Sequence, residues 1–288
     1  MRLIFMGTPA PAVPTLRAIA EESEVVAVYT RPDKAKGRGL HIEASPVKKA
    51  ALDLGLHVVQ PKSLKNEAAA LRELEPDVIL VVAYGAILRP DVLSVPRLGC
   101  VNVHFSLLPR WRGAAPIERA ILAGDGRTGV TTMLMDEGLD TGPILLQEPS
   151  DIGGDDTTGT LRSRLADLGS ELAIRTLHAL ESGRIEPHSQ PEDGATYAEK
   201  LNPADAELDL SDPADVLARK VRAMSPSPGA FVRFRRKRLK IWRAEVGGDG
   251  VVLPGGLRLI EVQPEGKRRM SAEEFARGYR PNFADFGV

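Results

Sequence analysis

Residues 1–180 alternate short apolar runs with helical patterns, and this alternation restricts the fold more than any other feature of the chain. Strands that are joined through a helix pair in parallel, because the helix supplies the crossover that returns the chain to the same edge. The predicted strands are residues 3–6, 24–29, 57–59, 78–83 and 100–104. We therefore predict an α/β fold with a doubly wound, Rossmann-like parallel sheet.

The remainder of the chain differs in composition from this first part. A long helix is predicted over residues 158–180, and residues 186–194, with two prolines and no apolar run, are typical of a linker. Short strands with glycine turns follow, which indicates a small barrel. The predicted division is a catalytic domain over 1–188, a linker over 189–205 and a C-terminal domain over 206–288.

Two polar side chains share one face of the strand predicted over residues 100–104. Because side chains alternate along a strand, Val101 and Val103 face one way and Asn102 and His104 face the other. Buried polar groups usually have hydrogen-bond partners, so this pair is compatible with a structural role or with a functional site.

A second polar cluster, residues 136–142, follows a strand predicted over 129–135, which is compatible with a hairpin partner at 144–148. Ligands bind at the carboxyl edge of open α/β sheets, and we expect Asp140 to emerge at that edge beside Asn102 and His104.

These three residue types support acyl-type transfer. An amide and an imidazolium donate to an oxygen that becomes negative in a tetrahedral intermediate, and a carboxylate takes up the proton of an attacking amine. Ser106 lacks the Gly-x-Ser-x-Gly context of an activated serine, and no run has metal-ligand spacing. The sequence therefore predicts direct transfer without a covalent enzyme intermediate and without a metal.

Composition and charge limit the other possibilities. The single cysteine, Cys100, excludes an internal disulfide, and its apolar neighbours predict a buried thiol. No segment approaches the roughly 18 consecutive apolar residues of a membrane span. Residues 1–7 enter a strand at once, which leaves no room for a signal peptide, so we expect a cytoplasmic protein.

The net charge of −1 conceals an asymmetry. Residues 200–288 carry 17 Lys and Arg against 12 Asp and Glu, a net +5, whereas residues 1–199 carry −6. A basic run in the C-terminal part consists of Arg233, Arg235, Arg236, Lys237, Arg238 and Lys240. A long basic loop in the first part holds Lys34, Lys36 and Arg38. Both segments are compatible with a solvated surface or with contacts to the phosphates of a nucleic acid.

Several runs of the sequence resemble the signature of the folate-dependent formyltransferases. The central run is Asn102-Val-His-Phe-Ser-Leu-Leu-Pro109, followed by Leu139-Asp-Thr-Gly142. The run Arg110-Trp-Arg-Gly-Ala-Ala-Pro-Ile117 is similar to members that act on methionyl-tRNA. So are Gly7-Thr8-Pro9, Arg31-Pro-Asp33, Gly37-Arg38-Gly39, Ser45-Pro-Val-Lys48, Val82-Ala-Tyr-Gly85 and Thr196-Tyr-Ala-Glu-Lys200. The resemblance covers nearly the whole chain.

The resemblance implies an enzyme that moves a formyl group from 10-formyltetrahydrofolate to the α-amino group of initiator methionyl-tRNA. It implies that Asn102, His104 and Asp140 are catalytic. It implies a folate pocket lined by Tyr84, Gly85, Ala86, Ile87, Leu88, Ser106, Leu107, Leu108, Pro109, Asp136, Glu137 and Gly138. It also implies that the basic loop and an OB-like C-terminal domain, with its basic run, contact the tRNA. We expect a monomer that has no membrane partner.

The chain departs from the family pattern at two places. Phe105 stands where relatives carry a small residue or proline, so its ring either narrows the pocket or packs in the core. The segment between Ala244 and Leu257 is shorter than usual, which predicts an abbreviated barrel.

Two other functions stay open on the sequence. One is a formyltransferase for a small amine, such as a purine ribonucleotide or an amino-sugar nucleotide, and the other is a non-catalytic RNA-binding relative. The basic segments favour tRNA over a small acceptor, and the retained catalytic side chains argue against a non-catalytic protein.

Overall fold

The structure, a computed structural model, describes residues 1–36 and 41–286. The chain forms two compact units. Unit 1 comprises Met1–Gly113, Thr128–Ser150 and Arg162–Tyr197, and unit 2 comprises Ala114–Arg127, Asp151–Leu161 and Ala198–Val288. The domain limits proposed from the sequence stay a prediction.

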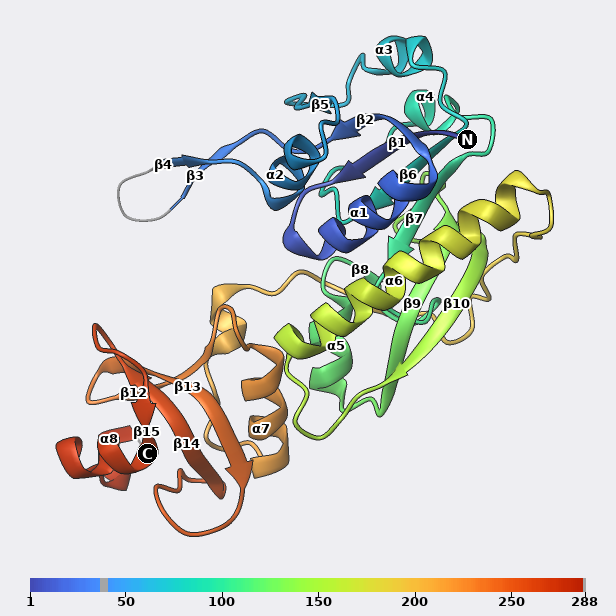
Figure 1. Ribbon diagram of the computed structural model, residues 1–288. Coiled ribbons are helices and arrows are strands. Elements are labelled where there is room, and N and C mark those ends of the chain that lie inside the picture. The colour runs from blue at the N-terminus through green and yellow to red at the C-terminus, as the bar shows by residue number, and fades with distance from the viewer. Residues whose placement is uncertain (37–40, 287–288) are drawn as a thin grey trace. The chain divides into compact units, whose positions relative to one another are not determined.

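Unit 1 is built on a seven-stranded sheet with the order β10-β9-β7-β6-β1-β2-β5 (Figure 1). Its strands are β1 (Arg2–Gly7), β2 (Glu24–Tyr29), β5 (Val58–Val59), β6 (Val78–Val82), β7 (Cys100–His104), β9 (Arg127–Leu134) and β10 (Ile144–Asp151). β1 pairs in parallel with β2 and β6, as do β2 with β5 and β6 with β7, whereas β9 runs antiparallel to β7. The chain adds strands on one side of β1 and then on the other, which confirms the doubly wound α/β fold.

Helices cover both faces of this sheet. They are α1 (Val13–Glu22), α2 (Pro46–Asp53), α3 (Ala68–Glu73), α4 (Pro90–Leu93) and α6 (Thr158–Glu181). One face packs against α3 and α4 through Ile4, Met6, Ile79, Val81, Cys100, Leu71 and Val92. α1 and α6 lie on the near side of the sheet in Figure 1.

The Phe105 ring packs against helix α6. A Cβ atom built on Gly169 of α6 would lie 3.1 Å from Val103 Cγ1 and 3.4 Å from Phe105 Cε1. Val103 and Phe105 therefore pack against α6, on the opposite face from Asn102 and His104, as strand alternation requires. Of the two possibilities for the Phe105 ring, the structure supports packing.

The Cys100 side chain lies on the α3–α4 face of the sheet and is buried, as predicted. Burial raises the pKa of the Cys100 thiol to about 12. The thiol therefore stays protonated at neutral pH and serves packing.

Unit 2 centres on a four-stranded antiparallel sheet with the order β12-β13-β14-β15. Its elements are α5 (Pro116–Ala123), α7 (Ala214–Ala223), β12 (Ala230–Phe234), β13 (Lys237–Val246), β14 (Leu257–Pro264), β15 (Met270–Ser271) and α8 (Ala272–Tyr279). Side chains on one face of the sheet, including Val232, Leu239, Ile241 and Val262, form the core with Leu217 of α7 and Phe275 of α8. This small sheet agrees with the predicted abbreviated C-terminal domain.

Several short elements were not predicted. They are β3 (Lys34–Lys36), β4 (His41–Glu43), α4, β8 (Arg112–Gly113), β11 (Tyr197–Ala198), β15, α8 and the 3₁₀ helices Ala10–Ala12, Pro203–Ala206 and Phe283–Phe286. In Figure 1, β3 and β4 project from the seven-stranded sheet as an antiparallel pair. Within the described ranges 1–36 and 41–286, no helix combines the length and apolar character that crossing a membrane requires.

Candidate active site

The end of β7 carries two polar side chains on the same face. Asn102 is partly buried and His104 is 5% exposed, whereas the flanking Val101 and Val103 pack in the core. The alternation predicted from the sequence is confirmed. Both polar side chains need partners, because a buried polar group without a hydrogen bond is costly.

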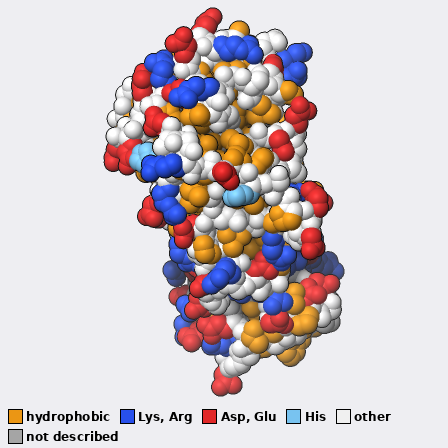
Figure 2. Space-filling model, turned by 90° about the vertical axis from the view of Figure 1, so that its right-hand side faces the viewer, with side chains coloured by type: hydrophobic (Ala, Val, Ile, Leu, Met, Phe, Trp, Pro, Cys, Tyr) orange, Lys and Arg blue, Asp and Glu red, His pale blue; other side chains and the backbone are white. Residues whose placement is uncertain are grey.

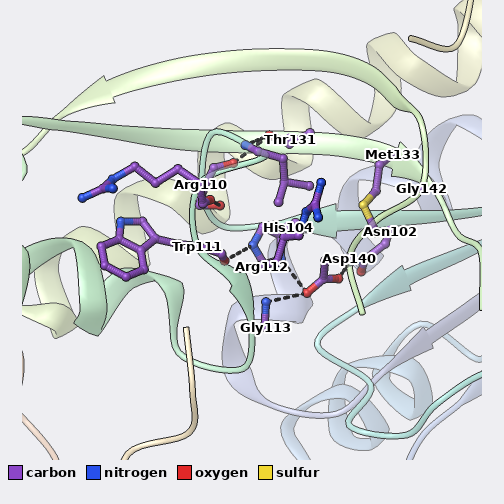
Figure 3. Close-up of polar contacts among 12 residues, drawn as sticks. Asn102, His104, Arg110, Trp111, Arg112, Gly113, Thr131, Met133, Asp140 and Gly142 are labelled. Carbon is purple, nitrogen blue, oxygen red and sulfur yellow. Dashed lines mark hydrogen bonds and ion pairs between the residues drawn. The ribbon is translucent and has the colours of Figure 1, made fainter. Parts of the chain in front are cut away.

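Asp140 supplies those partners (Figure 3). Its Oδ1 accepts a hydrogen bond from Asn102 Nδ2 at 3.2 Å, and its Oδ2 accepts one from the Gly113 backbone N–H at 2.8 Å. The same Oδ2 lies 3.5 Å from His104 Nδ1. The structure therefore brings together the three residues that the sequence predicts to be catalytic.

The route by which Asp140 reaches this place differs from the predicted one. We expected the segment 136–142 to emerge at the same edge as the end of β7, but β9 is antiparallel to β7 and Leu134 pairs with Val101 at the start of that strand. The chain after β9 folds back: the Met135 N–H donates to the Cys100 carbonyl, and Asp140 adopts φ 55°. The convergence is thus produced by a returning loop and not by parallel strand ends.

The His104 ring is held at both nitrogens. Nε2 lies 2.9 Å from the Trp111 carbonyl oxygen, and because a carbonyl only accepts, Nε2 must carry a hydrogen and donate it. Nδ1 faces the Asp140 carboxylate. Each ring nitrogen therefore faces an oxygen atom, that of the Trp111 carbonyl at Nε2 and that of the Asp140 carboxylate at Nδ1.

The loop after β7 uses its polar groups internally. Ser106 is 1% exposed, and its Oγ donates to the Arg110 carbonyl at 2.6 Å. The Leu108 N–H donates to Thr131 Oγ1 at 3.1 Å, and Thr131 Oγ1 donates to the Ser106 carbonyl at 2.7 Å. Ser106 therefore shapes the loop through this hydrogen bond.

In the other two predicted folate-lining segments, residues 84–88 and 136–138, several side chains are buried or bonded within the protein. Tyr84 and Leu88 belong to the core, and burial raises the pKa of the Tyr84 phenol, whereas Ile87 between them is 82% exposed. Asp136 is exposed, and its Oδ1 accepts from the Gly138 N–H and Thr141 Oγ1, which closes a tight turn. Only the exposed parts of these segments are available to a ligand.

Sequence reasoning gave no role at the site to Gln190 or Arg112. Gln190 Nε2 donates to the carbonyl oxygens of Asp140 and Gly142, each at 2.8 Å. Gln190 Oε1 accepts from Arg112 Nε at 3.0 Å. Gln190 falls in the segment that composition marked as a linker, and nothing local in the sequence distinguishes it from a solvated glutamine.

The basic loop is described only in part. Lys34 and Lys36 lie in β3, which pairs with β4, and Arg38 lies outside the described residues. The base of this β3–β4 hairpin is ordered by Lys48, whose Nζ donates to Asp33 Oδ2 at 2.6 Å and to Gln60 Oε1 at 2.7 Å.

The basic run of unit 2 is partly engaged within the protein. Arg233 pairs with Glu207, Arg235 pairs with Asp285, Arg238 lies over the Phe231 ring, and Lys240 donates to the Pro228 carbonyl. Arg236, in the turn between β12 and β13, and Lys237, the first residue of β13, are exposed. Basic and acidic side chains are interspersed on the face shown in Figure 2. Composition alone therefore overstated the number of free cations.

In the described part of the chain, no group of three or more His, Cys, Asp or Glu side chains could hold a metal ion. The reactive groups present are an amide, an imidazole and a carboxylate.

Two family models match this chain. The family model described as "Formyl transferase" matches residues 1–177, and that described as "Formyl transferase, C-terminal domain" matches residues 200–280. The chain is 49% identical over 299 residues to the methionyl-tRNA formyltransferase of Methylococcus capsulatus, covering 97% of each chain. It is 46% identical over 299 residues to the enzyme of that name from Neisseria gonorrhoeae, covering 96% of this chain and 97% of the relative.

Solved structures share the fold. An N-formyltransferase from Helicobacter canadensis, in complex with folinic acid and dTDP-3-aminofucose, superposes with a TM-score of 0.69 at 18% identity. The match covers 91% of this chain and 98% of that one. At this identity the likeness shows the fold alone.

Proposed function

This chain belongs to the formyltransferase family, and from that membership we propose that it transfers the formyl group of 10-formyltetrahydrofolate to the α-amino group of methionyl-tRNA. Relatives 46–49% identical over nearly the whole chain carry that activity in their names. The product is the formylated initiator used in translation initiation. The observation that carries the proposal is the Asn102–His104–Asp140 cluster at the end of β7.

The residues present fit such a formyl donor. 10-Formyltetrahydrofolate supplies a formyl carbon that an amine attacks, and negative charge then builds on the formyl oxygen. Asn102 uses one amide hydrogen on Asp140 and keeps a second for that oxygen. His104 lies beside this pair, with its Nδ1 3.5 Å from Asp140 Oδ2. The donor set therefore matches the charge that develops.

Asp140 has two roles in this proposal. Its carboxylate holds Asn102 and His104, and it accepts the proton that the attacking α-amino group releases, directly or through a water molecule. As the tetrahedral intermediate collapses, the bond between the formyl carbon and N10 of the donor breaks and the proton taken up by Asp140 passes to N10. The products are tetrahydrofolate and a neutral amide, and no covalent bond to the enzyme is needed. Ser106 stays in its bond to the Arg110 carbonyl throughout.

We place the folate in the loops at residues 84–88, 106–109 and 136–138. β6 is parallel to β7 and adjacent to it, so the segment 84–88 leaves the same edge of the sheet as His104. The exposed Ile87 and the backbone of Gly85 and Ala86 are the accessible parts of that segment, whereas Tyr84 and Leu88 support it from the core.

We assign the tRNA contacts to the β3–β4 hairpin, with Lys34, Lys36 and Arg38, and to the basic run of unit 2. Within that run Arg236 and Lys237 are the strongest candidates, because Arg233 and Arg235, although also exposed, are paired with carboxylates. Phosphate contacts of this kind give affinity and orientation. We further propose that the enzyme acts as a monomer in the cytoplasm, where aminoacylated tRNA is used.

A panel of acceptors tests the proposed function. The purified protein is given 10-formyltetrahydrofolate and, in separate reactions, methionyl-tRNA, glycinamide ribonucleotide or an amino-sugar nucleotide. We expect formyl transfer to methionyl-tRNA only. Transfer to a small amine in preference to methionyl-tRNA would favour the small-acceptor alternative, and inactivity with all three would favour a non-catalytic relative.

A further inference from the structure

Arg112 is the bulkiest of the fully buried side chains in residues 1–36 and 41–286, and it lies next to the site. Only 1% of it is exposed. Its Nε donates to Gln190 Oε1 at 3.0 Å, and its Nη1 lies 3.6 Å from Glu192 Oε1. A guanidinium has donors and no acceptor, so the Gln190 atom that faces it must be the oxygen. Arg112 therefore fixes the orientation of the Gln190 amide.

This orientation directs the amide nitrogen of Gln190 at the loop that carries Asp140. The two hydrogens of Nε2 meet two acceptors, the carbonyl oxygens of Asp140 and Gly142, each at 2.8 Å. Asp140 has φ 55°, a left-handed conformation that a non-glycine residue holds only when its surroundings support it. Gln190 supplies such support at the residue itself.

The segment 188–196 also holds the opposite side of the site. The Thr196 carbonyl accepts from the Arg112 N–H at 2.8 Å, and Thr196 Oγ1 accepts from the Trp111 N–H at 2.9 Å. The Trp111 carbonyl in turn accepts from His104 Nε2. One segment thus orders the backbone that presents Asp140 and the backbone that orients His104.

We propose that Gln190 is a positioning residue for the catalytic carboxylate, with Arg112 setting its amide, and this rests on the proposed formyl transfer at Asp140. Both ends of the Gln190 amide are bonded within the protein. Gln190 holds the Asp140 backbone so that one carboxylate oxygen reaches Asn102 and the other reaches Gly113 and His104. Gln190 and Thr196 therefore belong to the catalytic unit, although both fall in the predicted linker.

A double-mutant cycle tests this proposal in the full-length protein. Gln190→Leu removes the donors at nearly constant volume, and it is combined with Asp140→Asn. We expect Gln190→Leu alone to lower kcat by about 10- to 100-fold, because small misplacements of a catalytic group are costly. KM for both substrates should change by no more than about twofold, since ground-state binding is untouched. In the Asp140→Asn background the further loss should be less than about threefold, because the group that Gln190 positions is already gone.

Controls separate positioning from folding and from the proposed function. Ser189→Ala, at the exposed neighbouring position, should keep wild-type kcat. Gln190→Glu keeps an acceptor for Arg112 but replaces the donor by oxygen, so it should also lower kcat even if Gln190→Leu is poorly folded. Wild-type kcat in a Gln190 variant, or the full loss repeated in the Asp140→Asn background, would overturn the inference while leaving formyl transfer intact. Failure of the wild-type protein to formylate methionyl-tRNA would overturn both.

Discussion

The cluster at the end of β7 and the basic run of unit 2 were both predicted from residue type. They differ in burial and in the partners of their polar side chains. Asn102, His104 and Asp140 are largely buried and bound to one another. In the basic run, Arg233 and Arg235 are exposed yet paired with carboxylates. Polar residues on a buried strand face must find partners, and so their grouping is informative. Exposed cations can pair with any nearby carboxylate, and so their number says little about which are free for a ligand.

The cluster should show the larger response to a single change. Asp140→Asn keeps the shape of the side chain but removes the charge that holds His104 and the base that accepts the amine proton. We expect kcat to fall about 1,000-fold, in the range typical of lost general-base and electrostatic catalysis. Steady-state kinetics with methionyl-tRNA measures the effect, with Asp167→Asn on the exposed surface of α6 as the matched control. A loss of only a few-fold would remove Asp140 from the chemistry.

The basic run should respond through binding and not through chemistry. Replacing both Arg236 and Lys237 with alanine should raise the KM for methionyl-tRNA about tenfold and reduce the salt dependence of binding by about two ion equivalents. Arg233→Ala, which removes a cation already paired with Glu207, should change KM about twofold at most. Steady-state kinetics measures the KM, and titration of tRNA binding at several salt concentrations measures the salt dependence. Equal effects of the paired and the exposed cations would remove the distinction between them.

The smallest effect is expected at the base of the β3–β4 hairpin. There Asp33 and Lys48 form an ion pair, as in the basic run, but both are partly buried, as in the cluster at the end of β7. Hydrogen bonds from Lys48 and Gln60 hold the pKa of Asp33 below its usual range. Its stabilising contribution is therefore present above the unfolded-state pKa of about 3.9 and is lost as the pH falls through the lower folded-state pKa. Asp33→Asn should lower the urea midpoint at neutral pH, and the difference from wild type should shrink in strong acid.

Asp53→Asn is the control for that measurement, because Asp53 is exposed and its ion pair with Arg17 is long, at 3.8 Å. It should leave the urea midpoint nearly unchanged at both pH values. A deficit of Asp33→Asn that is the same in acid as at neutral pH would show that the charge of Asp33 is not what stabilises the hairpin base.

The sequence was sufficient for the sheet and for the three central residues. Short apolar runs separated by helical patterns predicted the doubly wound topology, and strand alternation placed Asn102 and His104 on one face. The reason given for the position of Asp140 was wrong, because β9 is antiparallel to β7 and the loop must fold back. A helix between two strands predicts a parallel pair only if it crosses back over the same sheet, and α5, which lies between β7 and β9 in the chain, belongs to unit 2.

Other features were beyond local reasoning or were overlooked. The bonds from Gln190 to Asp140 and Arg112 join residues that are 50 and 78 positions apart, and no nearby pattern marks them. Helix α8 did have a signal, since Ser271 and Glu274 form a capping box at its start. The free or paired state of each cation in the basic run depends on carboxylates from distant segments such as Asp285.

The most direct test of the account is a single-turnover measurement with His104→Ala. Enzyme in excess over methionyl-tRNA is mixed with 10-formyltetrahydrofolate, and tRNA affinity is measured in parallel, with the exposed His57→Ala as the control. We predict formyl transfer about 1,000-fold slower than wild type, with unchanged tRNA affinity, because His104 acts on the developing charge and not on binding. Formyl transfer by His104→Ala at the wild-type rate would contradict the assignment of catalysis to the cluster at the end of β7.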